Sequence, residues 1–297
     1  MKVVFIVPSH REENINYIHE VSTNCKSKEI GWAIGMNGPN LSSNYDFMWN
    51  NLVMEYKELT IHDPMISMAE ARANADQTAT TFFNPKYRIL ADHNFKYVRN
   101  WEEYILEAID EMDKFTEITG RQCFMGMGGV LGSYGHGRKA FLGVQPIFST
   151  SKGIIYSMAN AYDKMLKLPS SLDEQYLCTI LFMEGHVPLK KMMSPIIHTR
   201  IHDNEDIHNP EILANKFNTL VLREIWHDQN WVLQPKTTSK PPDLPDGRYY
   251  GHVPRTGLKA MAKLKTELSK IPGVYENFIK ISYEKEAGKL TGKDLFS

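Results

Sequence analysis

Residues Tyr87–Phe95 have the sequence YRILADHNF, and this stretch decides the fold. It is an apolar run that ends in three side chains able to bind a cation, Asp92, His93 and Asn94. The run is short, follows Asn84-Pro85 and gives way to polar residues, which predicts a buried strand with Asp92 and Asn94 at its carboxyl end. Open α/β sheets bind their ligands at that edge. Residues two apart on an extended chain point to the same side, so the Asp-x-Asn spacing offers two oxygen donors to a hard divalent ion. A simple Asx turn is the alternative.

Three strand-helix units precede this stretch in the predicted structure. The predicted strands are Val3–Val7, Ile30–Met36 and Glu58–His62. The predicted helices are one with Ile15, Ile18, His19 and Val21 on one side, one around Phe47–Tyr56 and one at Ser67–Phe82. This β-α-β-α-β-α-β order predicts parallel strands, right-handed crossovers and helices on both faces of the sheet.

The second half is also predicted to alternate helices with strands. The predicted elements are an amphipathic helix at Trp101–Thr119 ended by Gly120, a strand at Gln122–Met127, a helix from Gly153 to Leu166, a helix from Pro169 to Gly185 and a strand at Val187–Met193.

Composition favours one catalytic domain with an appendage, since 42% of the 297 residues are hydrophobic. The formal net charge is -1, but residues 236–297 contain 12 Lys/Arg against 7 Asp/Glu. Such an excess is typical of a segment that contacts a polyanion, and a Lys-rich solvated helix is the alternative. The 3 cysteines have no CxxC spacing, which indicates free thiols in a reducing compartment. No segment approaches the ~20 apolar residues of a membrane helix, so we expect a soluble, cytoplasmic protein.

Two later groups of polar residues are candidates for chemistry. Asp173 and Glu174 lie in the first turn of the helix predicted after Pro169, where they either favour the helix dipole or supply a catalytic base. Three histidines fall between His198 and His208 without the His-Glu-x-x-His spacing of a zinc helix. We therefore expect one of them to complete the cation site of Asp92 and Asn94.

These features together resemble the A-type (GT-A fold) glycosyltransferases over about residues 1–205. The resemblance implies a Rossmann-type, mostly parallel α/β sheet with helices on both faces and a small helical C-terminal appendage. It implies a metal site for Mn²⁺ or Mg²⁺ at Asp92, Asn94 and His198, in which Asn94 stands where the family has a second Asp and so removes one negative charge. It also implies that Asp173 or Glu174 is the base. The residues that this resemblance places around the nucleotide-sugar are Pro8, Ser9, His10, Arg11, Arg72, Asn74, Asp92 and His93.

The domain organisation follows from the same resemblance. Residues 1–235 are predicted to form the glycosyltransferase domain, with a nucleotide-sugar half at about 1–100 and an acceptor half at about 101–235. A proline-rich linker at 236–255 and a basic helical tail at 256–297 follow.

The acceptor is predicted from a second resemblance, since Asp92–Phe95 and the basic tail are similar to the bacteriophage-type, TET-associated DNA-base glycosyltransferases. This implies transfer to 5-hydroxymethylcytosine, or a related hydroxymethylpyrimidine, in double-stranded DNA within the host cytoplasm, with the base flipped out. The residues predicted to contact DNA phosphates are Lys236, Lys240, Arg248, Arg255, Lys259 and Lys263.

Three other functions remain open from the sequence. A glycosyltransferase could instead use a glycan or protein acceptor. A sugar nucleotidyltransferase should have a glycine-rich phosphate turn near the N-terminus, and Pro8–Glu12 contains no glycine. A nucleotide- or DNA-binding module without chemistry would give Asp92, Asn94 and His198 purely structural roles.

Overall fold

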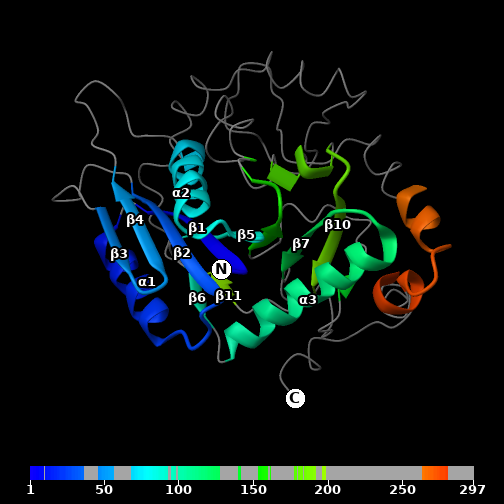
Figure 1. The fold of residues 1–297 in the computed structure, drawn as a ribbon, viewed down its shortest axis with the longest axis horizontal. Helices are drawn as coiled ribbons and strands as arrows, with labels where there is room; N and C mark the ends of the chain where they lie inside the picture. The colour runs from blue at the N-terminus through cyan, green and yellow to red at the C-terminus, as the bar shows by residue number, and fades with distance from the viewer. Residues whose placement is uncertain are drawn as a thin grey trace, which may run out of the picture.

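The computed structural model describes residues 1–9, 11–36, 46–56, 68–92, 95–97, 100–127, 140–141, 153–159, 161, 177–178, 180–182, 184–191, 196–198 and 263–279. Within these ranges, one mixed sheet has the strand order β3-β4-β2-β1-β5-β9-β7-β10-β8 (Figure 1). Its strands are β1 (Val3–Ser9), β2 (Ile30–Met36), β3 (Asp46–Trp49), β4 (Leu52–Tyr56), β5 (Tyr87–Leu90), β7 (Cys123–Met127), β8 (Ala140–Phe141), β9 (Ile154–Tyr156) and β10 (Val187–Lys191).

Most strands of this sheet run in one direction. β1 pairs in parallel with β2 and β5, β2 with β4, and β7 with β10. β9 is antiparallel to both β5 and β7, so β5 and β7 again share one direction. The carboxyl ends of β1, β2, β5, β7 and β10 therefore lie at the same edge of the sheet. The predicted α/β fold with a mostly parallel sheet is confirmed.

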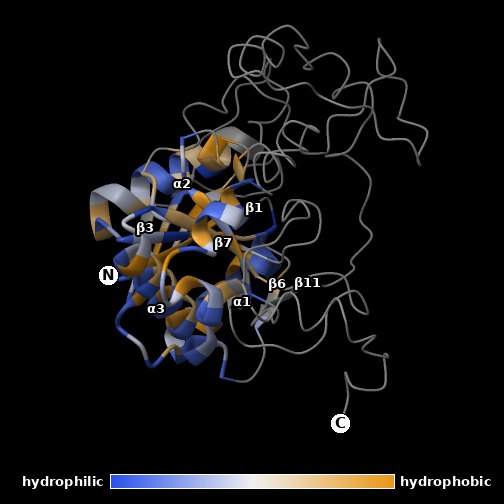
Figure 2. Cartoon of the chain, turned by 90° about the vertical axis from the view of Figure 1, so that its right-hand side faces the viewer, coloured by the Kyte–Doolittle hydropathy of each residue, from blue (hydrophilic) through white to orange (hydrophobic). Residues whose placement is uncertain are grey.

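Helices cover both faces of the sheet (Figure 1). Val3, Phe5 and Val7 of β1 belong to one core with α1 (Glu12–Asn24) and α3 (Trp101–Thr119). Val4 and Ile6 belong to a second core with α2 (Met68–Phe83) and the helical residues 177–178 and 180–182. This alternation follows from the period of two in a strand. In Figure 2 the strands at the centre consist mostly of hydrophobic residues, whereas the helices around them contain both hydrophobic and hydrophilic residues.

The structure corrects two predicted helices. Residues predicted as a helix at Phe47–Tyr56 form the β3–β4 hairpin, since Asn50 adopts a left-handed turn with φ 45° between two apolar runs. Within the helix predicted from Gly153 to Leu166, Ile154–Tyr156 is strand β9, buried between β5 and β7. Both runs are rich in β-branched or aromatic residues and too short for their period to separate strand from helix. The strand predicted at Glu58–His62 lies outside the described residues.

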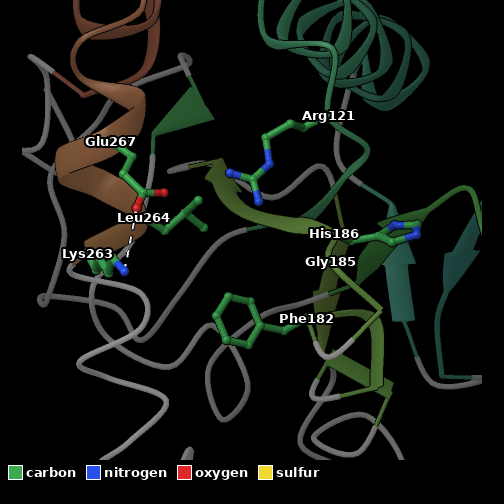
Figure 3. A pocket seen from close by; sticks show the side chains of 7 residues that line it. All are labelled: Arg121, Phe182, Gly185, His186, Lys263, Leu264 and Glu267. Carbon is green, nitrogen blue, oxygen red and sulfur yellow. Dashed lines mark ion pairs between the residues drawn. The ribbon is translucent and has the colours of Figure 1, made fainter.

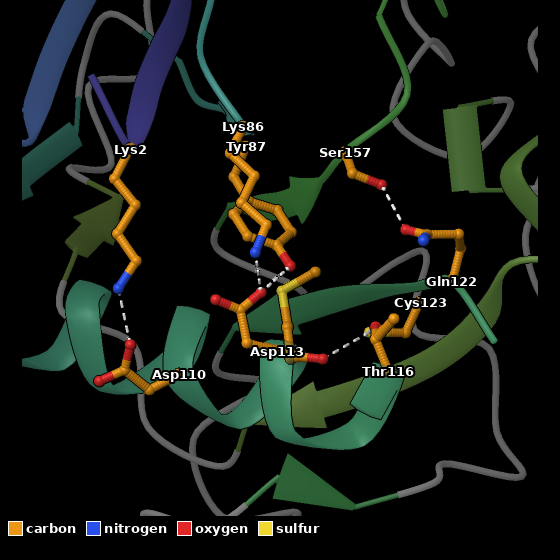
Figure 4. A network of polar contacts seen from close by, with 10 residues as sticks. Lys2, Lys86, Tyr87, Asp110, Asp113, Thr116, Gln122, Cys123 and Ser157 are labelled. Atoms are coloured by element: carbon orange, nitrogen blue, oxygen red, sulfur yellow. Dashed lines mark hydrogen bonds and ion pairs between the residues drawn. The ribbon is translucent and has the colours of Figure 1, made fainter. Parts of the chain in front are cut away.

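Polar contacts join α3 to the amino ends of β1 and β5 (Figure 4). Lys2 donates to Asp110 at 2.7 Å, while Lys86 and Tyr87 donate to Asp113 at 2.6 and 2.5 Å. Burial acts to raise the pKa of Asp113, but the hydrogen bonds from Lys86 and Tyr87 outweigh it and hold this pKa below its usual value. These contacts tie Asp110 and Asp113 of α3 to the amino edge of the sheet, opposite to the carboxyl ends.

The C-terminal residues 263–279 pack on α3. Leu264, Leu268, Val274 and Phe278 belong to the same core as α3, and the rings of Phe278 and Phe115 meet edge to face at 5.2 Å. Tyr275–Ile279 forms a π-helical turn. The predicted linker at 236–255 lies outside the described residues. None of the helices described here is long and apolar enough to span a bilayer.

Gly35 of β2 sets how closely α2 approaches the sheet. A Cβ atom at this position would lie 1.9 Å from the carbonyl oxygen of Ala71 in α2. Since that neighbour is backbone, the helix itself would have to move. Gly35 therefore holds the first turns of α2 against the carboxyl end of β2.

We expect Gly35→Ala to lower the free energy of unfolding by roughly 1–3 kcal/mol, because overpacking forces a backbone shift. Gly31→Ala on the same strand is the matched control. Its Cβ would lie 3.1 Å from Asn51 O and 3.1 Å from the flexible side chain of Met1, so a smaller loss is expected. Urea unfolding measures both, and equal losses would contradict a specific role for Gly35.

Candidate active site at the carboxyl edge of the sheet

Ser9 ends β1 and begins the loop that leads to α1. Its side chain is 1% exposed, and its hydroxyl donates to the carbonyl of Arg11 at 3.3 Å and accepts from the Arg11 N–H at 3.4 Å. This local turn ends the strand and starts α1 one residue after Arg11. Pro8 is buried within β1 and pairs with Gly35. Pro8, Ser9 and Arg11, all predicted near the nucleotide-sugar, thus lie at the carboxyl edge.

Arg72 and Asp92 form a salt bridge at this same edge. Arg72 Nη2 donates to Asp92 Oδ1 at 2.5 Å, and the side chains of Arg72 and Asp92 are 1% and 24% exposed. Arg72 comes from the second turn of α2, and Asp92 lies two residues after the end of β5. The partly exposed carboxylate is therefore oriented by a buried cation from another element.

A second ion pair lies one helical turn deeper. Asp76 of α2 pairs with Arg88 Nε of β5, and these side chains are 1% and 2% exposed. Arg88 also donates to Thr80 Oγ1 at 2.8 Å and to the carbonyl of Pro85 at 3.4 Å. Because burying an ion is costly unless its hydrogen bonds are satisfied, these contacts hold α2 and β5 in one register.

The direction of α2 adds to the electrostatics of this edge. Ala71 contacts the carboxyl end of β2, so the amino end of the helix lies at the same edge as Ser9 and Asp92. Peptide N–H groups at a helix N-terminus favour anions nearby. Asn74, predicted to reach the nucleotide-sugar, is half-buried in this part of α2.

A small two-stranded sheet brings a distant histidine to the same region. β6 (Phe95–Tyr97) pairs antiparallel with β11 (Ile196–His198), and His198 stands opposite Phe95. Phe95 N–H donates to the carbonyl of Asp92 at 3.4 Å. The backbone of His198 is therefore adjacent to the chain that follows Asp92, although the two residues are far apart in sequence.

An aromatic cluster anchors β6 to the main sheet. The Trp32 indole N–H donates to the Tyr97 hydroxyl at 3.1 Å, and the rings of Phe5 and Trp32 stack at 5.5 Å. Trp101 at the start of α3 packs edge to face on Tyr97 at 4.8 Å. Burial raises the pKa of Tyr97 well above its usual value, so its hydroxyl stays protonated. This cluster fixes the strand that carries the pairing partner of His198.

Several predicted site residues lie outside the part of the chain that the structure describes. They are His10, His93, Asn94, Asp173, Glu174, Lys236, Lys240, Arg248, Arg255 and Lys259. Lys263 is described and exposed, and it pairs with Glu267 at 4.0 Å. Among the described residues, no group of three or more His, Cys, Asp or Glu side chains forms a metal cluster. The roles of Asp92, Asn94 and His198 as metal ligands stay predictions.

Sequence reasoning missed Asp76, Arg88 and Gly35. The sequence did contain a signal for the Asp76–Arg88 pair. Arg88 lies in the middle of an apolar strand, where a charge needs a partner, and Asp76 follows Arg72 by four residues on a predicted helix. For Gly35 the sequence offers no such signal, because only the approach of α2 makes its missing side chain necessary.

No protein-family model and no curated protein matches this chain. Among solved structures, the chain is similar to S. aureus TarS 1-349 in complex with UDP-GlcNAc, with 14% sequence identity and a TM-score of 0.48 over 77% of this chain and 66% of that chain. A second structure of S. aureus TarS 1-349 gives 13% identity and a TM-score of 0.46, covering 97% of this chain and 92% of that chain.

A CMP:2-keto-3-deoxy-manno-octonic acid synthetase complexed with CTP gives 9% identity and a TM-score of 0.36, over 67% of this chain and 94% of that one. In the match with the UDP-GlcNAc complex, this chain spans less than two thirds of the TarS chain. At these levels of identity and TM-score, the likeness assigns no activity to this protein.

We expect Arg88→Met to destabilise the fold by about 3–5 kcal/mol, because it leaves the Asp76 carboxylate buried without its cation. The double variant Arg88→Met/Asp76→Leu should recover most of this loss, since neither charge remains. Lys86→Met, two residues away in an exposed ion pair with Asp113, should cost at most ~1 kcal/mol. Urea unfolding of the three variants tests this, and a double variant as unstable as Arg88→Met would contradict it.

Proposed function

We propose that the protein is a GT-A glycosyltransferase that transfers a sugar from a nucleoside diphosphate sugar, in the first place a UDP-sugar, to a hydroxyl group. The observation that carries this proposal is the convergence of Ser9, Arg72, Asp92 and the backbone of His198 at the carboxyl edge of one sheet. Edges of this kind bind nucleotides in open α/β folds.

The donor diphosphate would be stabilised by fixed positive charge. As the bond between the sugar and the diphosphate breaks, negative charge grows on the leaving group. Arg72 is a buried cation beside the edge, and the amino end of α2 presents N–H dipoles to the same region. Charges that are already oriented require no rearrangement during the reaction, so they stabilise the transition state efficiently.

Asp92, Asn94 and His198 are the residues that we propose to hold Mn²⁺ or Mg²⁺. The residues present fit such an ion, since carboxylate and amide oxygens with one imidazole suit Mn²⁺. An ionised carboxylate has about four lone-pair sites, so Asp92 can accept from Arg72 and also bind a cation. When bound, the ion would act as a Lewis acid on the leaving diphosphate.

For the acceptor we propose 5-hydroxymethylcytosine, or a related hydroxymethylpyrimidine, in double-stranded DNA. The basic excess of residues 236–297 supports this choice, because DNA phosphates attract such a segment. Asp173 or Glu174 would take the proton from the acceptor hydroxyl. A glycan or protein acceptor is the alternative, and the acceptor test below separates the two.

Turnover of the donor tests the reaction class. Purified full-length protein with Mn²⁺ should slowly hydrolyse at least one member of a panel of UDP-sugars, releasing UDP. Asp92→Asn keeps an oxygen that can accept from Arg72 but loses the negative charge, so we expect the rate to fall about 100-fold or more. Circular dichroism should show that the variant remains folded.

Asp110→Asn is the matched control, because it makes the same chemical change in an ion pair with Lys2 at the opposite edge of the sheet. It should retain the parental rate. Equal rates in Asp92→Asn and the parent protein, or no UDP release from any donor, would refute the proposed function.

Mass spectrometry of DNA duplexes tests the acceptor. A duplex with 5-hydroxymethylcytosine should gain the mass of one sugar residue, whereas the same duplex with unmodified cytosine should not. Sugar transfer to a glycan or protein, with no transfer to either duplex, would refute DNA as the acceptor. It would leave the proposed use of a UDP-sugar donor unaffected.

A further inference from the structure

A pocket of about 260 Å³ lies away from the candidate active site, where the C-terminal segment meets the sheet (Figure 3). Arg121 lies two residues before β7, and Gly185 and His186 directly precede β10. Since β7 and β10 run in the same direction as β1 and β5, these residues lie at the amino edge of the sheet. Ser9 and Asp92 lie at the carboxyl edge, so the pocket is a separate place on the molecule.

Both walls of the pocket are fixed by packing. On one wall, Gly185 ends a helix with φ +86°, and His186 N–H bonds the carbonyl of Leu181 at 3.0 Å, as in a Schellman motif. On the other wall, residues 263–268 are helical, and Leu264 and Leu268 are buried in the core beside α3. The pocket is thus part of the folded chain on both sides.

The charges in the pocket are unbalanced. In the part of the chain that the structure describes, the Arg121 guanidinium forms neither an ion pair nor a side-chain hydrogen bond, and Figure 3 shows it pointing between the two walls. Lys263 faces Glu267 across 4.0 Å, at the limit of an ion pair. Burial lowers the pKa of His186, so this side chain is neutral at pH 7. Two cations therefore face one carboxylate.

The rest of the lining is apolar. Phe182 and Leu264 form its aromatic and aliphatic surfaces, and both side chains pack against the core. An arginine fork beside apolar surface binds planar or tetrahedral oxyanions well, because guanidinium donates several hydrogen bonds and is weakly hydrated. An aromatic ring next to it suits an organic substituent on that anion.

We propose that this pocket binds an organic phosphate, with the phosphate between Arg121 and Lys263 and its apolar or aromatic substituent against Phe182 and Leu264. A nucleotide unit of a nucleic acid strand and a free phosphorylated small molecule share this chemistry. The site is separate from the proposed donor site, since it lies at the other edge of the sheet, and it shares only Lys263 with the residues predicted to contact DNA.

Calorimetric titration of the full-length protein with phenyl phosphate at low salt tests the proposal. Arg121→Gln should weaken binding about tenfold, and Lys263→Gln about threefold, because each removes a cation from the anion. Glu267→Gln should tighten binding about threefold, because it removes the opposing carboxylate and releases Lys263. A loss of folding would weaken binding in every variant, so it could not produce weaker binding in Lys263→Gln together with tighter binding in Glu267→Gln.

Lys270→Gln is the matched control, because Lys270 is an exposed lysine of the same segment that does not line the pocket. It should bind phenyl phosphate as the parent protein does. Failure of phenyl phosphate to bind, or equal affinity in the parent and Arg121→Gln, would overturn the proposal. All variants are compared by thermal melting so that unfolding is recognised.

Competition then identifies the source of the phosphate. A short single-stranded oligodeoxynucleotide that displaces phenyl phosphate from the parent protein, and binds more weakly to Arg121→Gln, indicates a nucleic acid strand. Displacement by inorganic phosphate or small phosphate esters but not by the oligonucleotide indicates a free small molecule.

Discussion

Two arginine-aspartate pairs, one of them fully buried, join α2 to β5 and the residues that follow it, and the site depends on them. Arg72 pairs with Asp92 at the exposed end, and Asp76 pairs with Arg88 one helical turn deeper. α2 runs antiparallel to β5, so Arg72 and then Asp76 along the helix meet Asp92 and then Arg88 in reverse order along the strand. Each charge on the helix therefore faces an opposite charge. A shift of the helix along the strand would separate both pairs and leave buried ions uncompensated, which is strongly unfavourable. The position of Asp92 is therefore set by the register of a helix on a strand.

The neighbouring elements are held to the same frame by different forces. Because Gly35 has no side chain, the backbone of α2 can pack directly against β2, which places Arg72 at the carboxyl edge. Stacked and edge-to-face rings of Phe5, Trp32, Tyr97 and Trp101 hold β6 on the core. β6 in turn pairs with β11 and brings His198 near the chain after Asp92. Charge, close packing and aromatic contact thus converge on one edge.

The sequence predicts two buried strands and the long amphipathic helix well. Val3–Val7 and Ile30–Met36 are continuous runs of apolar residues and glycine bounded by turn residues, and Trp101–Thr119 has a clear helical period. Prediction fails at β3, β4 and β9, whose short apolar runs fit either period. The position of Asp92 after a buried strand was predicted from the local pattern, and Arg72 was selected through the family resemblance. Asp76, Arg88 and Gly35 acquire their structural roles only from contacts between elements distant in the chain. Such contacts are set by tertiary packing, which a single sequence does not display.

The central claim is that the diphosphate of a nucleotide-sugar and its metal bind at the carboxyl edge beside Asp92. A crystal structure of the protein grown with UDP and Mn²⁺ tests this directly. We predict that the diphosphate will lie near Ser9, Arg72 and the amino end of α2, with Mn²⁺ between its oxygens and the side chains of Asp92, Asn94 and His198. A nucleotide bound at the amino edge, or at the carboxyl edge without any contact to Asp92 or Arg72, would contradict this account.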